Sequence, residues 1–323
     1  MAIFAITAAT TLYLAIYSNN AFAINENSIN ASKAFSSFAL NEENNNSIIK
    51  NNNQNYTTTN LKNTEQQNNL LIAKLLAKNL ENHIQKAGAI LEITGKLPQV
   101  RDFSFVNVLN QTLKTLHGIP QNADIEKRQV ARDILSSNSD LFKVFLVLPN
   151  GNMYLLEPYS VQKGLTANNY AFRDYFQGAI KTNDIYLGNV IISTAASHDK
   201  EAVIAAPVYS LKYNSTIVGV WGGSIDFGAL NKELQSLNIA SSDNNTRIVY
   251  VGHLGQKVAD SDLNKSNIPE SFANLQSFKN AANGQSGSVM DTVNNTKMMV
   301  TYQPVKVFNN TWAVLLMGPL QQQ

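Results

Sequence analysis

The stretch "NNYAFRDYFQGAIKTNDIYLGNVIIST", residues 168–194, decides the fold, because its pattern changes from helix to strand. Its first half is polar, with Arg173 followed by the aromatic pair Tyr175 and Phe176. Its second half, from residue 185 to 194, is rich in isoleucine, valine and tyrosine, which favour strands. Only 15% of the chain is charged, so a guanidinium among aromatic rings next to a strand calls for an explanation.

The residues on either side predict an antiparallel α+β unit. Two apolar runs flank Pro149, Asn150, Gly151 and Asn152, which is a hairpin signal. After the opening stretch, "EAVIAAPVYSL" (201–211) and "STIVGVWGGSIDF" (215–227) predict two further strands, and a helix follows near 229–237. Residues 140–237 therefore predict a hairpin, a helix and three strands.

The same order recurs further along the chain. "RIVYVGHLGQKVAD" (247–260) predicts a hairpin and "ESFANLQSFKNAANGQ" (270–285) a helix. Three predicted strands follow, in the segments "GSVMDTV" (287–293), "KMMVTYQPVKVF" (297–308) and "WAVLLMGPL" (312–320). The chain is therefore expected to contain two related folds in tandem.

A long helix is expected before the first unit. From residue 69, apolar side chains recur three and four positions apart, at Ile72, Leu76, Leu80, Ile84, Ala87 and Leu91. Gly95 and Pro98 predict its end. Shorter helices are expected at 103–116 and 123–136. Residues 24–68 are polar and rich in asparagine, so we expect a flexible linker there.

The first 23 residues predict export. An apolar run from Ala2 to Tyr17 ends in Ala21, Phe22 and Ala23, the small-residue pattern of a signal peptide, so the segment is expected to act as a signal or as an N-terminal anchor. Nine N-x-S/T sequons support an extracellular or cell-surface location with surface glycosylation. The alternative, a buried N-terminal helix, fits poorly with the polar segment that follows.

Composition argues against several classes of function. A net charge of +2 gives no electrostatic footprint for nucleic acid. The chain has no cysteine, and its four histidines lack metal-ligand spacing. No phosphate-binding loop or nucleophile elbow is present. We therefore expect neither an enzyme nor a protein that needs a cofactor or metal.

Three local patterns, in this order, resemble the double Cache sensor family over roughly residues 69–320. "FRDYFQGAI" is similar to the arginine-x-aromatic-aromatic helix of that family. "AVIAAPVYS" with "IVGVWGGSIDF" resembles its central strand pair, which ends in aspartate before a helix. "MVTYQPVKVFNNTWAVLLMGP" resembles its closing strands.

The resemblance implies an α+β fold in which a long N-terminal helix precedes two tandem PAS-like antiparallel-sheet subdomains. Residues 69–139 would hold the helices, 140–240 the membrane-distal ligand-binding subdomain, and 241–320 the membrane-proximal one. It implies an extracytoplasmic small-molecule sensor in signal transduction or chemotaxis. Two alternatives stay open: a solute-capture protein for a transporter, and a ligand-free cell-surface structural protein.

Arg173 and Asp226 are the main candidate ligand-binding residues. Arginine offers a planar fork for a carboxylate, and a nearby carboxylate would take an ammonium group. The expected ligand is a carboxylate, an amino acid, an amine or a small planar metabolite. Structural alternatives also stand. Arg173 would tie to Asp226 or to a backbone carbonyl, Asp226 would cap the helix after it, and Tyr175 and Phe176 would be core residues.

The chain departs from the amino-acid-binding members of that family. Their Tyr-x-Asp pair falls here on Ile191 and Ser193, and their upstream tyrosine falls near Asn168, beside Tyr170. Part of the ammonium site is therefore missing. The secondary candidates are Ser193, Thr194, Tyr154 and Tyr186. Besides the ligand, the expected partners are a membrane receptor or transporter and a second copy of the chain through the long helix.

Overall fold

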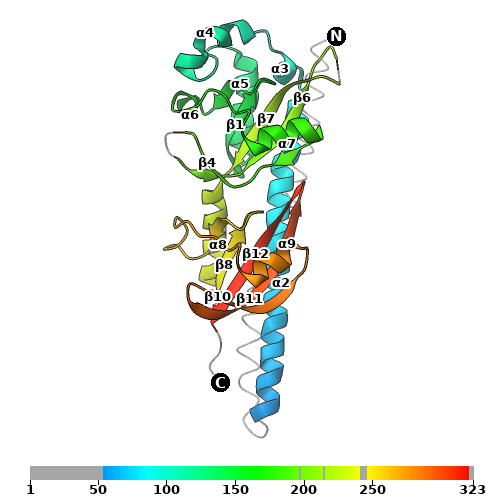
Figure 1. The fold of residues 1–323 in the computed structure, drawn as a ribbon, viewed down its shortest axis with the longest axis vertical. Coiled ribbons are helices and arrows are strands. Elements are labelled where there is room, and N and C mark those ends of the chain that lie inside the picture. Colours follow the sequence, from blue (N-terminus) through cyan, green and yellow to red (C-terminus); the bar gives the residue numbers. More distant parts are fainter. Residues whose placement is uncertain (1–53, 196–197, 214, 241–245, 320–323) are drawn as a thin grey trace. The chain divides into compact units, whose positions relative to one another are not determined.

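The computed structural model describes residues 54–195, 198–213, 215–240 and 246–319 (Figure 1). The predicted export segment, 1–23, lies outside the described residues. The chain divides into two compact units. One comprises Met1–Leu61 with Leu237–Asn244, of which the structure describes only two helix ends. The other, Lys62–Ser236 with Asn245–Gln323, contains both sheets.

The long helix α2 spans Gln54–Gly95. It begins before residue 69, so the expectation that all of 24–68 is a flexible linker is wrong for its last part. The segment 54–68 contains no glycine or proline to break a helix, and residues 64–67 are exposed, so they need no apolar stripe. The predicted stripe faces the core: Leu76, Leu80, Ile84, Ala87 and Leu91 are all buried.

Three short helices lead into the first sheet: α3 (Pro98–Arg101), α4 (Val106–Leu116) and α5 (Ile125–Ser137). Two of them match the predicted helices closely, and α3 is additional. Helix α5 buries Arg128 completely. Its guanidinium donates to Glu157 Oε1 over 2.7 Å and to the carbonyl of Ile119 over 2.9 Å. This ion pair fixes α5 to the edge of the sheet.

The distal sheet has five antiparallel strands in the order β2-β1-β7-β6-β3. They are β1 (Leu141–Val147), β2 (Met153–Glu157), β3 (Tyr186–Leu187), β6 (Val203–Tyr209) and β7 (Ile217–Ile225). The predicted hairpin joins β1 to β2, and Gly151 in its turn has a φ of 86°, which favours glycine. Two helices follow β2: α6 (Tyr159–Lys163) and α7 (Asp174–Thr182).

The single strand expected over residues 185–194 is instead two short strands. After β3 the chain leaves the sheet, and β4 (Ile191–Ile192) pairs with β5 (Lys200–Glu201) outside it. The break has a local cause. The Asp174 carboxylate accepts the amide of Asn189 over 2.6 Å and so holds it away from the ladder.

The proximal sheet repeats the topology of the distal sheet. Its strands are β8 (Arg247–Val251), β9 (Lys257–Asp260), β10 (Gly287–Val293), β11 (Thr296–Val307) and β12 (Asn310–Pro319). Helix α8 (Phe227–Ala240) precedes it, and α9 (Gln276–Ala282) lies between β9 and β10. Counted along the chain within each sheet, both have the order second, first, fifth, fourth, third. The predicted tandem is therefore confirmed.

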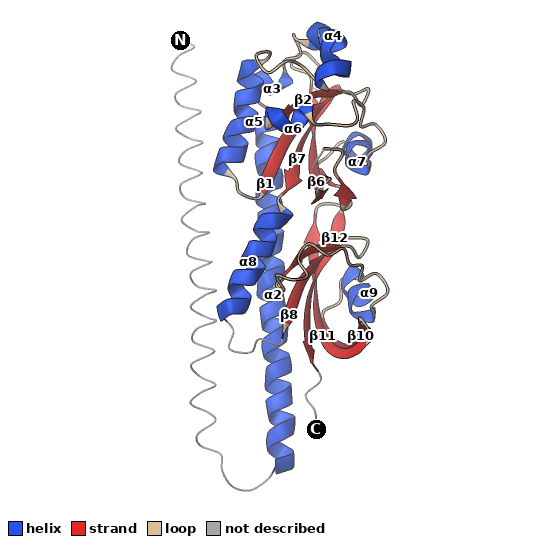
Figure 2. Ribbon diagram, turned by 90° about the vertical axis from the view of Figure 1, so that its left-hand side faces the viewer, coloured by secondary structure: helices blue, strands red, loops and turns tan. Residues whose placement is uncertain are grey.

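Each sheet is covered on both faces. Helices α2 and α5 lie on one face of the distal sheet and α7 on the other (Figure 2). On the proximal sheet, α2 and α8 lie on one face and α9 on the other. Trp221 of β7 is fully buried and donates its indole N–H to Thr94 of α2 over 3.1 Å. The α7 face is a mainly apolar layer, and it contains most of the predicted site residues.

The two sheets also contact each other through one strand end. The backbone N–H of Leu187 in β3 donates to Asn309 Oδ1 over 2.7 Å, and the Leu187 carbonyl accepts from Asn309 and Asn310. Next to this point, Ile185 and Phe308 pack against Gly88 of α2, so closely that a Cβ there would lie 2.3 Å from the Phe308 ring. We call Leu187, Asn309 and Asn310 the strand clasp.

Candidate functional site

Helix α7 lies across one face of the distal sheet and buries its apolar side there. Tyr175, Phe176 and Ala179 are buried, and Gln177 and Lys181 on the same helix are exposed. The Tyr175 ring lies 5.8 Å from the Phe145 ring of β1. The pattern predicted from "FRDYFQGAI" is therefore confirmed as an amphipathic helix, and its two aromatics contribute to the core of this layer.

A buried polar cluster lies within this layer. Lys143 of β1, 3% exposed, donates to Glu201 Oε2 over 2.8 Å and to Ser193 Oγ over 3.0 Å. Ser224 of β7 lies directly opposite Lys143 in the strand register, and its buried hydroxyl has no hydrogen-bond partner among the residues that the structure describes. We call Lys143, Ser193, Glu201 and Ser224 the polar cluster. Burying a charge or a hydroxyl costs free energy unless the group is paired, so the unpaired hydroxyl of Ser224 requires an explanation.

Two tyrosines adjoin the polar cluster. Tyr170 Oη lies 2.9 Å from Thr194 Oγ1 and 3.1 Å from the Ala167 carbonyl. Burial raises the pKa of Tyr170 and, more strongly, that of Tyr175, and the negative charge of Glu201 raises both further. Both phenols are therefore neutral at physiological pH and can donate a hydrogen bond.

Arg173 lies where α7 begins, at the edge of this layer. Its guanidinium Nη2 donates to the carbonyl of Ile192 over 3.0 Å, and its charge lies 4.9 Å from the centre of the Phe172 ring. Phe172 is itself 60% exposed. These contacts match the alternative in which Arg173 ties to a backbone carbonyl. The tie fixes the segment around β4, which we call the covering segment.

Asp226 has a different set of contacts. Its Oδ1 accepts the backbone N–H of Ala229 over 3.1 Å, so it caps α8, and its own N–H donates to the Asp140 carbonyl over 2.9 Å. Within the described residues no ion pair joins Asp226 to Arg173. The direct tie between Arg173 and Asp226, one of the structural alternatives, is therefore not formed among these residues. Binding of a ligand by either residue stays a prediction.

The secondary candidates divide between the two faces of the sheet. Ser193, Thr194 and Tyr186 lie in the α7 layer, where the Tyr186 ring packs against Gly178. Tyr154 does not join them. Its hydroxyl donates to Asp124 over 2.8 Å and its ring lies 4.5 Å from the Lys127 cation. The register shift between β1 and β2 places this extra residue on the helix side, which corrects the expectation for Tyr154.

Sequence reasoning missed Lys143, Glu201 and Ser224. Lys143 is the only charged residue in the strand "LFKVFLV", and a single charge in a buried strand is a usable signal. Glu201 and Ser224 had no such signal. They meet Lys143 only because β1, β7 and the start of β6 are neighbours in the sheet.

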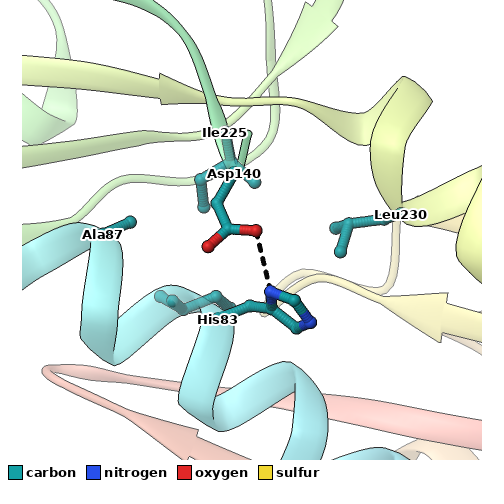
Figure 3. Close-up of a pocket in the computed structure, with 6 residues that line it drawn as sticks. His83, Ala87, Asp140, Ile225 and Leu230 are labelled. Atoms are coloured by element: carbon teal, nitrogen blue, oxygen red, sulfur yellow. Dashed lines mark hydrogen bonds and ion pairs between the residues drawn. The ribbon is translucent and has the colours of Figure 1, made fainter. Parts of the chain in front are cut away.

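A second group of polar side chains lies on the opposite face, where α2 passes the start of β1. His83, Ile84, Ala87, Asp140, Ile225 and Leu230 line a small hollow there (Figure 3). His83 Nδ1 lies 2.7 Å from Asp140 Oδ1, and its Nε2 lies 3.4 Å from Glu233 Oε2. In the part of the chain that the structure describes, no group of three such side chains is arranged so that it could hold a metal ion.

Comparison with known proteins gives a consistent result. The family model of the Cache domain matches residues 57–322. No curated protein gives a match. Among the helices that the structure describes, none has the length and apolar character needed to cross a membrane.

Several solved structures with the same fold are sensor domains of chemoreceptors. The ligand-binding domain of Pseudomonas fluorescens CtaA with L-isoleucine is 17% identical, with TM-score 0.54, and 82% of this chain and 97% of that chain are covered. The periplasmic domain of Campylobacter jejuni Tlp1 is 15% identical, with TM-score 0.56 and coverages of 80% and 96%. Pseudomonas aeruginosa PctC with GABA is 16% identical, with TM-score 0.51 and coverages of 79% and 99%.

Proposed function

This chain belongs to the Cache domain family of ligand-binding sensor modules, and we propose that its ligand binds in the α7 layer of the distal sheet, beside the polar cluster. The double Cache resemblance inferred from the sequence is confirmed by the match over residues 57–322. The family serves chemoreceptors and sensor kinases, so the role of the module is detection and not catalysis.

The observation that supports this location is the polar cluster itself. An apolar layer that contains a buried Lys143–Glu201 ion pair and the unpaired Ser224 hydroxyl has the composition of a small-molecule site, in which a few directed polar groups stand among apolar walls. Tyr170, Tyr175 and Thr194 adjoin it. We expect a carboxylate, an amino acid, an amine or a small planar metabolite.

Arg173 contributes at the edge of this site. It is held over the covering segment by the Ile192 carbonyl, and a ligand anion would compete for the same donors because charge-assisted bonds are stronger than bonds to a neutral carbonyl. Asp226 retains its capping role. It would contact a ligand only through the carboxylate oxygen that does not accept the Ala229 N–H.

Signalling would follow from closure of the covering segment. β3 lies at one end of that segment, and the strand clasp connects β3 to the β11–β12 turn. A ligand that binds the closed form more tightly shifts the population toward it, and the clasp carries that shift to the proximal sheet and α2. We place the module outside the cytoplasm, with no enzymatic activity of its own, attached to a receptor and paired with a second copy along α2.

A thermal-shift screen of the full chain tests the function. Amino acids, carboxylates, amines and purines would be added singly, and a true ligand at a hundredfold excess over its Kd should stabilise the fold by about 2.7 kcal/mol. Arg173→Ala should weaken the shift caused by anionic ligands and leave the ligand-free melting temperature nearly unchanged. Lys181→Ala, an exposed cation of the same helix, is the matched control. A broad screen without any shift would favour a ligand-free structural protein.

A further inference from the structure

Helix α8 is attached to α2 by a polar contact on the face of the distal sheet opposite the α7 layer. Glu233 of α8 has its Oε2 3.4 Å from His83 Nε2, and its Oε1 accepts the side-chain amide of Asn79 of α2. His83 Nδ1 lies 2.7 Å from Asp140 Oδ1. A single imidazole of α2 thus lies between two carboxylates from two other elements, α8 and the residue before β1.

The apolar packing beside this contact is incomplete. The small hollow in Figure 3 is bordered by Ile84 and Ala87 of α2, by Ile225 of β7 and by Leu230 of α8. Side chains that border a void lose dispersion contacts on that side. The polar contacts of Glu233 therefore supply a larger share of the attachment of α8 to α2 at this point.

The imidazole can donate to both carboxylates only when it is charged. An imidazolium donates from both nitrogens, whereas a neutral imidazole has one N–H and one lone pair. The distance to Asp140 is the shorter one, so we expect neutral His83 to keep its proton on Nδ1 and to turn the Nε2 lone pair toward Glu233. The contact with Glu233 then changes from attraction to repulsion, and Asn79 is left as the donor to that carboxylate.

The charged groups around His83 place this change above neutral pH. Burial lowers the pKa of His83, as does Lys86 of α2, but the bond to Asp140 and the charges of Asp140 and Glu233 outweigh both and raise it above 6.5. Burial raises the pKa of Glu233. Glu233 also acts on Tyr250 of β8, whose pKa burial raises well above its ordinary value, so this phenol stays neutral. His83 is therefore the group that loses a proton as the pH rises through the neutral range.

We propose that this module is also a proton sensor, in which His83 holds α8 against α2 at acidic pH and releases it as the pH rises. Asp226 continues to cap the start of α8, so the release concerns the turn that contains Glu233 and leads toward the proximal sheet. None of these contacts belongs to the α7 layer, so the chain responds to pH with or without a small-molecule ligand.

Spin labels on α2 and α8 test for this release in the full chain. The chain has no cysteine, so labels attach only at introduced ones. Asn82→Cys and Ser236→Cys suit this purpose, because both residues are exposed and lie close in sequence to His83 and Glu233. The distance between the labels, measured by electron paramagnetic resonance, should show a held and a released population. From pH 6 to 8.5 the ratio of released to held should rise by about tenfold, as expected when a hydrogen bond to a charged group is lost.

Two variants in the labelled chain assign the response to the contact. His83→Gln keeps a donor for Asp140 but cannot titrate, and in Glu233→Gln the new amide can donate to the Nε2 lone pair of neutral His83. Both should give the same distances at pH 6 and 8.5. Glu92→Gln, which removes an exposed carboxylate of α2, is the control and should keep the native response.

Distances in the native sequence that do not change with pH would overturn the proposed sensor. A response to pH that persisted in His83→Gln or in Glu233→Gln would overturn it as well, because the release would then arise elsewhere in the chain.

Discussion

His83 Nδ1 lies 2.7 Å from Asp140 Oδ1, so a single imidazole connects α2 to the residue that precedes the distal sheet. Its other nitrogen lies 3.4 Å from Glu233 of α8, and Asn79 of α2 donates to the same carboxylate. Burial lowers the pKa of His83, but the hydrogen bond to Asp140 and the charges of Asp140 and Glu233 outweigh burial and the nearby Lys86, so the pKa is raised.

Stability should therefore fall as the pH rises above neutrality. A histidine whose pKa is higher in the folded state stabilises the fold below its unfolded value of about 6.5, and this contribution is lost as the pH rises through the folded value. Burial raises the pKa of Glu233, which acts in the same direction at lower pH. Between pH 6 and 8.5 the melting temperature should fall about 2–4 °C more in the native protein than in His83→Gln.

His253 provides the control for this prediction. It is exposed in the β8–β9 turn, so His253→Gln should retain the native dependence of melting temperature on pH. A native dependence that persisted in His83→Gln would mean that His83 does not titrate as the contacts with Asp140 and Glu233 require.

Gly88 of α2 should not tolerate even alanine. Alanine normally stabilises a helix interior by about 1 kcal/mol relative to glycine. Here a Cβ would lie 2.3 Å from the Phe308 ring and 2.8 Å from Ile185 Cδ1, so both side chains must move. We expect Gly88→Ala to lower the free energy of unfolding by about 1–2 kcal/mol, measured by urea denaturation.

Gly95→Ala is the matched comparison. Gly95 is in the same helix, and its Cβ would meet only Val208, at 3.9 Å. The free energy of unfolding should then stay the same or rise. Equal stability of the two variants would show that the contact between α2 and the Phe308 turn is not tightly packed.

Asn309→Ala should loosen the strand clasp. The variant loses the acceptor of the Leu187 N–H and one donor to the Leu187 carbonyl. Leu187 is fully buried, so water cannot replace these partners. Leaving a buried amide unpaired costs about 1–3 kcal/mol. Hydrogen exchange at residues 187–189 should become faster by about tenfold or more, whereas the exposed Asn267→Ala should leave it unchanged. Unchanged exchange in Asn309→Ala would exclude the clasp as the connection between the sheets.

The periodicity of apolar residues was sufficient to predict the order of the long helix, the main strands and the helices between them, because burial on one face imposes that period directly. Hairpin turns at Gly151 and Gly255 and the tandem of two sheets followed from the same signal. The start of α2 did not, because an exposed polar helix has no apolar period. Where residues 185–194 divide into two strands, Asn189 donates a hydrogen bond to Asp174, and the apolar pattern of this stretch does not encode that contact.

The site was harder to predict than the fold. Arg173 was noticed because it is a charge among aromatics, yet its partner is a backbone carbonyl that only the folded chain brings near. Asp226 looked equally like a ligand residue and a helix cap, and only the bond to Ala229 distinguishes the capping role. Glu201 meets Lys143 across 58 residues of sequence, a contact set by strand order and not by composition.

Glu270 should contribute strongly to the stability of the proximal sheet. Burial alone would raise its pKa, but hydrogen bonds from Arg247, Lys257 and Asn294 lower it to about 2. An acid whose pKa is lower in the folded state stabilises the fold above its unfolded value of about 4.5, and this contribution is lost as the pH falls through 2. Glu270→Gln should therefore cost about 3 kcal/mol at pH 7, since it leaves the two buried cations Arg247 and Lys257 with Asp260 as their one shared carboxylate, and much less at pH 3. Asp262→Asn, which removes a partly exposed carboxylate of the same loop, should cost less than about 1 kcal/mol at either pH. Equal losses from the two variants in urea denaturation at pH 7 would show that Arg247 and Lys257 do not depend on the loop carboxylate.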